Sequence, residues 1–168
     1  MLIGIMILGL MFIAACGSRY SRGQENHSSD NEISIAMSIC STYKKAELNA
    51  ALLNSINDIP KEEIQNKKAV INLTTASFFN KQSANHMYSR SLKVAWSKGH
   101  DLRINYLTIT QQSVTDHYIE LTYDCTLRFG EGKKDRMFVK GTMTLIKEDG
   151  HWKVNSDSYN SDEINDLM

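Results

Sequence analysis

The hydrophobic pattern of this chain changes its period near residue 100. Over residues 33–57 apolar side chains recur every three or four positions, which predicts a helix with one buried face. Lys44 and Glu47 fall largely off that face, and Asp58 with Pro60 marks its end. The face consists of Ala36, Ile39, Cys40, Tyr43, Ala46, Ala50, Leu53 and Ile56.

Two more helices are predicted before the change of period. One begins after Pro60 and runs toward Phe79, with acidic residues in its first turn. The other runs from about Ala84 to Lys98 and stops at Gly99, because glycine favours the left-handed conformation that ends many helices.

Beyond residue 100 apolar and polar side chains alternate, which predicts antiparallel strands with one buried face. The strands fall at 102–110, 116–129, 137–145 and 152–154, and a change of inward face near Leu107 indicates a bulge. The inward face of the longest strand carries His117, Ile119, Leu121, Tyr123, Cys125, Leu127 and Phe129. Its other face carries Asp116, Tyr118, Glu120, Thr122, Asp124, Thr126 and Arg128.

This order of elements predicts an α+β fold, with N-terminal helices packed on a curved four-stranded antiparallel sheet. The domain spans 33–156, and the acidic stretch 157–168 is predicted to be a tail or a short helix. A helix lying in the concave face of the sheet would place Cys40 opposite Cys125.

The chain begins with the apolar stretch MLIGIMILGLMFIAAC. It is shorter than the roughly 20 residues of a membrane-spanning helix and suits the apolar region of an export signal. Ile13-Ala14-Ala15-Cys16 resembles the lipobox of bacterial lipoproteins. The resemblance implies a signal peptide over 1–15, cleavage between Ala15 and Cys16, and a lipid on Cys16 that attaches the protein to a membrane. The alternative is an ordinary secretory signal or an uncleaved anchor, with Cys16 incidental.

Residues 16–32 are rich in Ser, Asn, Gly and charge, and we expect them to form a flexible tether after the lipidated cysteine. Export would place Cys40 and Cys125 in a compartment that permits disulfides, so the pair predicts one bridge. Two buried free thiols are the alternative.

Composition and charge set limits on function. The chain has 168 residues, with 19 Lys and Arg against 19 Asp and Glu, so its formal net charge is zero. That length favours one domain, and a neutral chain is unlike the usual basic nucleic-acid binder, so no nucleic-acid partner is expected.

The element order and the closing pattern over 143–154, which ends in Gly150-His151-Trp152-Lys153-Val154, resemble the cystatin-like, or nuclear transport factor two-like, superfamily. The resemblance covers about residues 33–156 and implies a helix lying on a curved sheet. Small bacterial lipoproteins and surface or periplasmic domains of conjugation and type IV secretion machines share this fold. The superfamily also includes enzymes and binding modules, so fold alone leaves the function open.

Enzymes of that superfamily place an Asp, His or Tyr in the concave pocket of the sheet. The candidates here are His117, Tyr123 and Tyr106, whereas Asp116 and Asp124 are predicted to point outward. Without an inward carboxylate on the long strand a buried general base is hard to build. No sequence motif of a nucleophile, phosphate loop or metal site occurs, so we expect no catalytic residue, cofactor or metal.

The sequence therefore favours a lipid-anchored, exported domain of the bacterial cell envelope that acts through protein contacts. Tyr118 and Glu120, on the outward face of the long strand, are the candidate interaction residues. An accessory part of a conjugation or secretion assembly, or a surface-exclusion lipoprotein, fits this description. The alternative is a small-ligand-binding or enzymatic domain that uses the pocket between helix and sheet.

Overall fold

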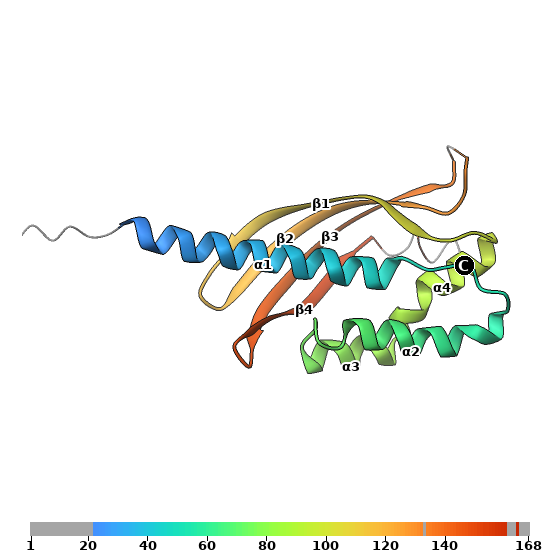
Figure 1. Cartoon of the computed structure of the whole chain (residues 1–168), viewed down its shortest axis with the longest axis horizontal. Coiled ribbons are helices and arrows are strands. Elements are labelled where there is room, and N and C mark those ends of the chain that lie inside the picture. The colour runs from blue at the N-terminus through green and yellow to red at the C-terminus, as the bar shows by residue number, and fades with distance from the viewer. Residues whose placement is uncertain (1–21, 133, 161–163, 165–168) are drawn as a thin grey trace, which may run out of the picture.

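The computed structural model describes residues 22–132, 134–160 and 164. Within them four α-helices precede and pack against an open four-stranded antiparallel sheet (Figure 1), which confirms the predicted α+β fold class. The elements are α1 (Arg22–Leu48), the 3-10 turn η1 (Ile56–Asp58), α2 (Ile59–Val70), α3 (Ala76–Ala84), the 3-10 turn η2 (Met87–Ser89), α4 (Arg90–Lys98), β1 (Arg103–Val114), β2 (Tyr118–Arg128), β3 (Arg136–Glu148) and β4 (His151–Tyr159).

The sheet is a meander in which each strand pairs with the next one along the chain, in the order β1-β2-β3-β4. β3 and β4 are joined at Asp149 and Gly150, whose φ angles are 53° and 78°. Positive φ at both positions is what a two-residue hairpin turn of type I′ requires, and the Asp-Gly pair supplies it. Register shifts interrupt β1 after Ile104 and after Gln111. β1 is therefore irregular, as predicted, but it has two shifts that flank Leu107 rather than one bulge at Leu107.

Helix α1 lies along the sheet and extends beyond it at its N-terminal end (Figure 1). It spans Arg22–Leu48, whereas the hydrophobic pattern predicts 33–57. The expectation that 16–32 is a flexible tether is therefore wrong for residues 22–32, which are helical. Extending a helix that is already packed costs little because only the first turn has to be nucleated.

The C-terminal end of α1 is set by contacts with β1. The side chain of Asn49 accepts a hydrogen bond from the backbone N–H of Ile104 at 2.7 Å. Ala50 then forms an antiparallel bridge with Leu102. These long-range bonds replace the helical ones, so the apolar positions after residue 50 do not continue the helix.

The predicted helix from Pro60 to Phe79 is two helices, α2 and α3, separated near Thr74. Thr74 forms a parallel bridge with Val154 of β4, and the side chain of Thr75 caps the start of α3 by accepting from the N–H of Phe78. Helix α4 begins at Arg90 rather than Ala84. It ends as predicted at Gly99, whose φ is 67°.

The boundary expected after residue 156 is also wrong. β4 runs to Tyr159, so the first residues assigned to an acidic tail over 157–168 belong to the sheet. Of the remainder the structure describes Asn160 and Ile164, and Ile164 is buried.

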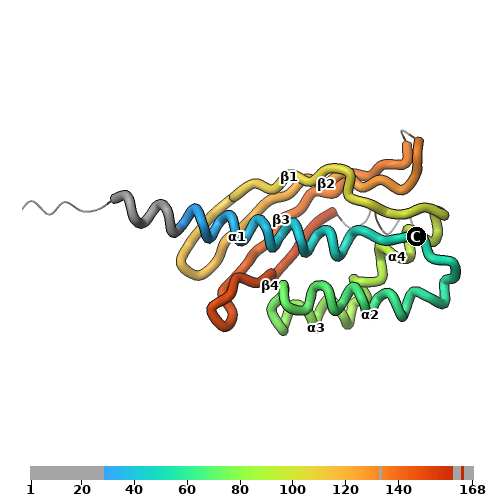
Figure 2. The backbone as a smooth tube through the Cα atoms, viewed as in Figure 1, coloured from blue at the N-terminus to red at the C-terminus, as the bar shows by residue number. Residues whose placement is uncertain are grey.

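One hydrophobic core lies between the helices and the inner face of the sheet. Figure 2 shows α1 running along the sheet and α2 and α3 lying beyond β4. The inner residues of β2, among them Ile119, Leu121 and Leu127, are fully buried, as their alternation predicts. The opposite, outer face of the sheet is left uncovered by these four helices.

Candidate functional site

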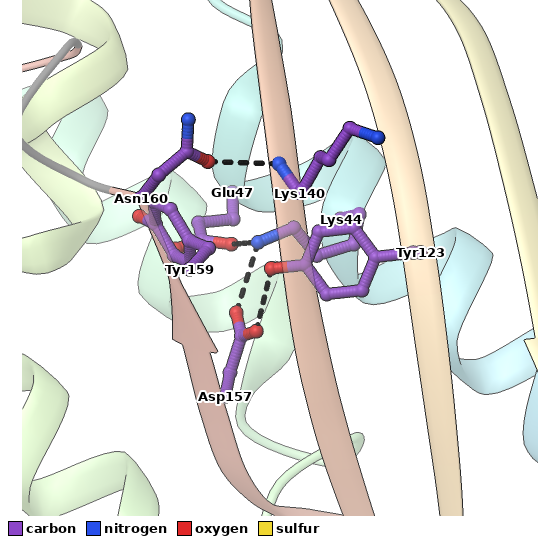
Figure 3. Close-up of polar contacts among 7 residues, drawn as sticks. All are labelled: Lys44, Glu47, Tyr123, Lys140, Asp157, Tyr159 and Asn160. Carbon is purple, nitrogen blue, oxygen red and sulfur yellow. Dashed lines mark hydrogen bonds and ion pairs between the residues drawn. The ribbon is translucent and has the colours of Figure 1, made fainter. Parts of the chain in front are cut away.

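A cluster of charged and hydroxyl side chains is buried inside the core, between α1 and the sheet (Figure 3). Lys44 and Glu47 come from α1, Tyr123 from β2, and Asp157 and Tyr159 from β4. We call these five residues the core charge cluster. They come together because α1 packs against both β2 and β4.

Lys44 is the centre of the core charge cluster. Its side chain is fully buried, and its Nζ lies 2.5 Å from Glu47 Oε2 and 2.9 Å from Asp157 Oδ2. Three aromatic rings surround the ammonium, with centroids 4.1 Å (Tyr159), 4.7 Å (Tyr123) and 5.8 Å (Tyr43) from Nζ. Ring faces attract a cation most strongly where water is excluded, so the rings help to compensate for the lost hydration.

Two tyrosines complete the hydrogen bonds of the carboxylates. The hydroxyl of Tyr159 donates to Glu47 Oε1 at 2.9 Å, and that of Tyr123 donates to Asp157 Oδ1 at 2.7 Å. All four carboxylate oxygens therefore have a partner inside the molecule. Without such partners, each buried carboxylate would reduce the free energy of unfolding by roughly several kcal/mol.

Gly141 on β3 gives the Tyr123 side chain its path across the sheet. It is the cross-strand neighbour of Tyr123, and a Cβ placed on it would lie 2.5 Å from the Tyr123 hydroxyl and 2.7 Å from the carbonyl oxygen of Ser158. No side chain fits there, which is a recurrent reason for glycine inside a strand.

The core charge cluster carries one cation and two carboxylates, so it has an excess of negative charge. Burial alone would lower the pKa of Lys44, but the carboxylates of Asp157 and Glu47 outweigh burial and raise the pKa. Burial raises the pKa of Glu47; Lys44 opposes this, and the charge of Asp157 adds to it. Lys44 therefore stays charged, while Glu47 takes up a proton more readily than an exposed glutamate.

Burial also raises the pKa of the Tyr123 and Tyr159 hydroxyls, and the neighbouring carboxylates add to the rise. Both hydroxyls therefore remain donors at every ordinary pH. The cluster as a whole ties α1 to β2 and β4 through directional bonds, which an apolar contact would not supply.

The sequence misplaced four members of the core charge cluster, since Tyr159, like Asp157, is assigned to the tail but lies on β4. Lys44 and Glu47 are predicted to lie off the buried face of their helix, but their exposed fractions are 0% and 2%. Asp157 is assigned to the tail, but its side chain is 2% exposed. A local sign of this cluster is that Lys44 and Glu47 are three residues apart in a helix, so their side chains can pair with each other beside Tyr43.

The three residues proposed for a concave pocket are not brought together. Tyr123 points inward and is buried, as predicted. His117 is exposed because β2 begins one residue later and leaves it in the turn. Tyr106 is 64% exposed, and it follows directly on the register shift after Ile104, which exchanges the two faces of β1.

Cys40 on α1 and Cys125 on β2 are both buried, and the structure holds them as free thiols. Burial raises the pKa of Cys40 to about 12 and that of Cys125 to about 11. The charge of Lys44 lowers the pKa of both thiols, but burial outweighs it. The bridge between them stays a prediction, and Ala15 and Cys16 lie outside the described residues.

The outer face of the sheet holds the candidate interaction residues. Tyr118 is 37% exposed and Glu120 is half-buried. Further along the same face, Tyr106 of β1 and Phe138 of β3 lie in one row on either side of Thr126. Both aromatic side chains are more than 60% exposed.

The surface of the domain is hollowed in several places. One hollow of about 390 Å³ lies at Gly99 and Gly130, and one of about 500 Å³ lies over Gly141 and includes Tyr123 and Tyr159 of the core charge cluster in its lining. A third, of about 350 Å³, lies between Ile56 and Trp96. Over the described ranges, no three side chains of His, Cys, Asp or Glu are grouped as metal ligands.

Neither the protein-family models nor the curated proteins compared with this chain give a match. Among the helices that the structure describes, none combines the length and the apolar character needed to cross a membrane.

Proposed function

We propose that this chain is a lipid-anchored protein of the bacterial cell envelope, and that the outer face of its sheet binds a protein partner. The anchor is the lipid on Cys16 that the lipobox-like sequence implies. The domain is similar to cystatin-like domains in its order of elements. An accessory role in a conjugation or secretion assembly, or in surface exclusion, is the specific function we favour.

One observation carries the proposal: Tyr106 and Phe138 are exposed in the same row of a sheet face that the four helices leave uncovered. Aromatic side chains are enriched at protein interfaces, where they provide large contact areas for little loss of rotational freedom. Tyr118 lies on the same face, so the surface extends toward the turn between β1 and β2.

The interior supports binding at the surface rather than chemistry in a pocket. The four carboxylate oxygens of Glu47 and Asp157 are occupied by Lys44, Tyr123 and Tyr159. A general base needs a free oxygen within reach of a substrate proton. The alternative, an enzyme or a binder of small ligands that uses the space between helix and sheet, would have to open this cluster first.

Photo-crosslinking in living cells tests the proposal. A benzoylphenylalanine placed at Phe138 should form an adduct with one partner, and the same residue placed at Ile71, an exposed position after α2, should not. Replacing Tyr118 and Glu120 with Ala should weaken the Phe138 adduct several-fold. Replacing the neighbouring, exposed His117 with Gln is the matched control and should leave it unchanged.

Equal adducts at Phe138 and Ile71 would contradict a specific surface. Loss of the Phe138 adduct with His117→Gln but not with the Tyr118 and Glu120 variant would move the contact from the outer face to the turn before β2.

A further inference from the structure

The two edge strands of the sheet, β1 and β4, differ in whether their outer backbone groups are hydrogen-bonded. The edge formed by β4 is bridged by the chain itself: Val154 donates to the carbonyl of Leu73 at 2.8 Å, and Thr75 donates to the carbonyl of Val154 at 2.9 Å. Helix α3 also packs against β4. β4 therefore presents no long, continuous edge to another strand.

The edge formed by β1 is open along most of its length. Its first residues are covered by Asn49 and Ala50, which bond to Ile104 and Leu102. Between 105 and 114, no strand in the part of the chain that the structure describes pairs with the side of β1 that faces away from β2.

The open edge also lacks the features that normally keep edge strands apart. The stretch 104–115 contains no Asp, Glu, Lys, Arg, His or Pro. Each of the other three strands carries charged residues, including Asp124 on β2, Lys140 on β3 and Lys153 on β4. Proteins usually protect open edges with charges or prolines, so an uncharged edge favours pairing with another strand.

We propose that two copies of this chain associate through β1, which pairs antiparallel with β1 of the second copy and joins the two sheets into one of eight strands. Antiparallel pairing of identical strands about a two-fold axis is self-complementary, and an uncharged strand brings no like charges together. Because β4 is already bonded to Leu73 and Thr75 at Val154 and is flanked by α3, we expect no further strand to add there, so the assembly stops at two chains.

The bulges on β1 limit where the two copies pair. Between the register shifts the strand is regular from Tyr106 to Gln111. Opposite residues of an antiparallel pair point to the same face, so the two-fold axis passes through Thr108 or through Ile109. In the first case Thr108 lies opposite Thr108 of the second copy. In the second case Thr108 lies opposite Thr110 of the second copy.

A second copy would also cover apolar surface. Leu107, Ile109 and Val114 on β1 are only partly buried against the core, unlike the fully buried Ile119 and Leu121 on β2. An added strand and its neighbouring helix would cover their exposed parts. The two proposals remain distinguishable although Tyr106 lies on β1, because strand pairing uses the backbone edge of β1, whereas the outer-face partner is expected to contact the outward side chains of Tyr106, Tyr118 and Phe138.

Disulfide crosslinking of the full-length protein in membranes tests the association. Chains with Thr108→Cys and Thr110→Cys should form a covalent dimer on mild oxidation in either register, because opposite residues of a strand pair are within disulfide distance. The matched control replaces Ser156 and Ser158 with Cys. These two exposed residues have the same spacing on the same face of β4.

Sedimentation of the purified full-length protein in detergent gives an independent measure. The unmodified chain should sediment as a dimer, and Thr108→Lys with Thr110→Lys should shift it to a monomer, because both registers then oppose like charges. Ser156→Lys with Ser158→Lys should leave the dimer intact. A monomer at micromolar concentration, or covalent dimers that form equally through the β4 control, would overturn the proposal, even if the outer-face adduct at Phe138 is observed.

Discussion

Lys44 and Asp157 lie 113 positions apart in the chain, and their side chains form a buried ion pair with Nζ and Oδ2 separated by 2.9 Å. The pair joins the first helix to the last strand, so it can form only when the whole domain has assembled. Replacing such a group with an apolar residue leaves its charged partners without compensation.

We expect Lys44→Met to destabilise the protein by about 3–5 kcal/mol, because Glu47 and Asp157 would remain buried without a cation. Urea unfolding followed by circular dichroism measures the change. The control is Lys45→Met at the exposed neighbouring position, which should change the free energy of unfolding by no more than about 0.5 kcal/mol. Equal effects of the two variants would show that the ion pairs contribute nothing specific.

The raised pKa of Glu47 predicts a pH dependence of stability. Because the folded state holds the Glu47 proton more tightly than the unfolded state does, the contribution of this group is fully present below the unfolded pKa of about 4.3. It is lost as the pH rises through the higher folded pKa. The wild type should therefore lose stability relative to Glu47→Gln as the pH is raised from about 4 toward neutrality.

The free energy of unfolding is measured for both proteins at each pH. The difference between them removes the contributions of the titrating groups that the two proteins share. Glu148→Gln is the control, because the hydrogen bond from Lys153 lowers the pKa of Glu148 and its difference should therefore change with pH in the opposite direction. A flat difference for Glu47→Gln would mean that Glu47 titrates as an exposed glutamate does.

Gly141→Ala should destabilise the domain by about 1–3 kcal/mol, the usual cost of overpacking a filled interior. The added methyl group would collide with the Tyr123 hydroxyl and with the backbone oxygen of Ser158. Gly132→Ala is the control, because the nearest atoms to its methyl group belong to the side chain of Asp135, which can turn away at the cost of one exposed hydrogen bond to the Gly132 N–H. Thermal unfolding of both variants compares them, and equal melting temperatures would contradict the packing described around Tyr123.

The predicted bridge between Cys40 and Cys125 is tested on the exported protein. Burial raises the pKa values of these thiols to about 12 and about 11, so free thiols would react slowly in the folded state. Alkylation should therefore be carried out in denaturant without a reductant and followed by mass spectrometry. A bridged protein should show neither cysteine modified, whereas modification of both would establish two buried thiols.

Lipid attachment at Cys16 is tested by Cys16→Ser, which should abolish incorporation of labelled fatty acid and processing of the signal peptide. The fractionation of the protein with membranes should be lost together with the label. Cys125→Ser serves as the control for loss of a cysteine elsewhere. Label retained in Cys16→Ser would show that the fatty acid is attached at another residue.

The period of the hydrophobic residues was sufficient to predict the order of elements. Alternation over β2 predicted which side chains are buried, and Gly99 predicted a helix end. These features depend on neighbours within a few residues, which is why a single sequence contains them. Helix limits were less accurate, because α1 ends where the backbone of Ala50 bonds to Leu102 and the side chain of Asn49 bonds to Ile104, contacts that local sequence does not reveal.

The sequence by itself determined the α+β class, the buried face of β2 and the lipobox-like start of the chain. Only the tertiary structure decided that Lys44, Glu47 and Asp157 belong to the core, since a charged side chain is buried only where partners from other elements meet it. It also decided that β1 is left open while β4 is covered. Both outcomes depend on contacts between residues far apart in the chain, and no local pattern records them.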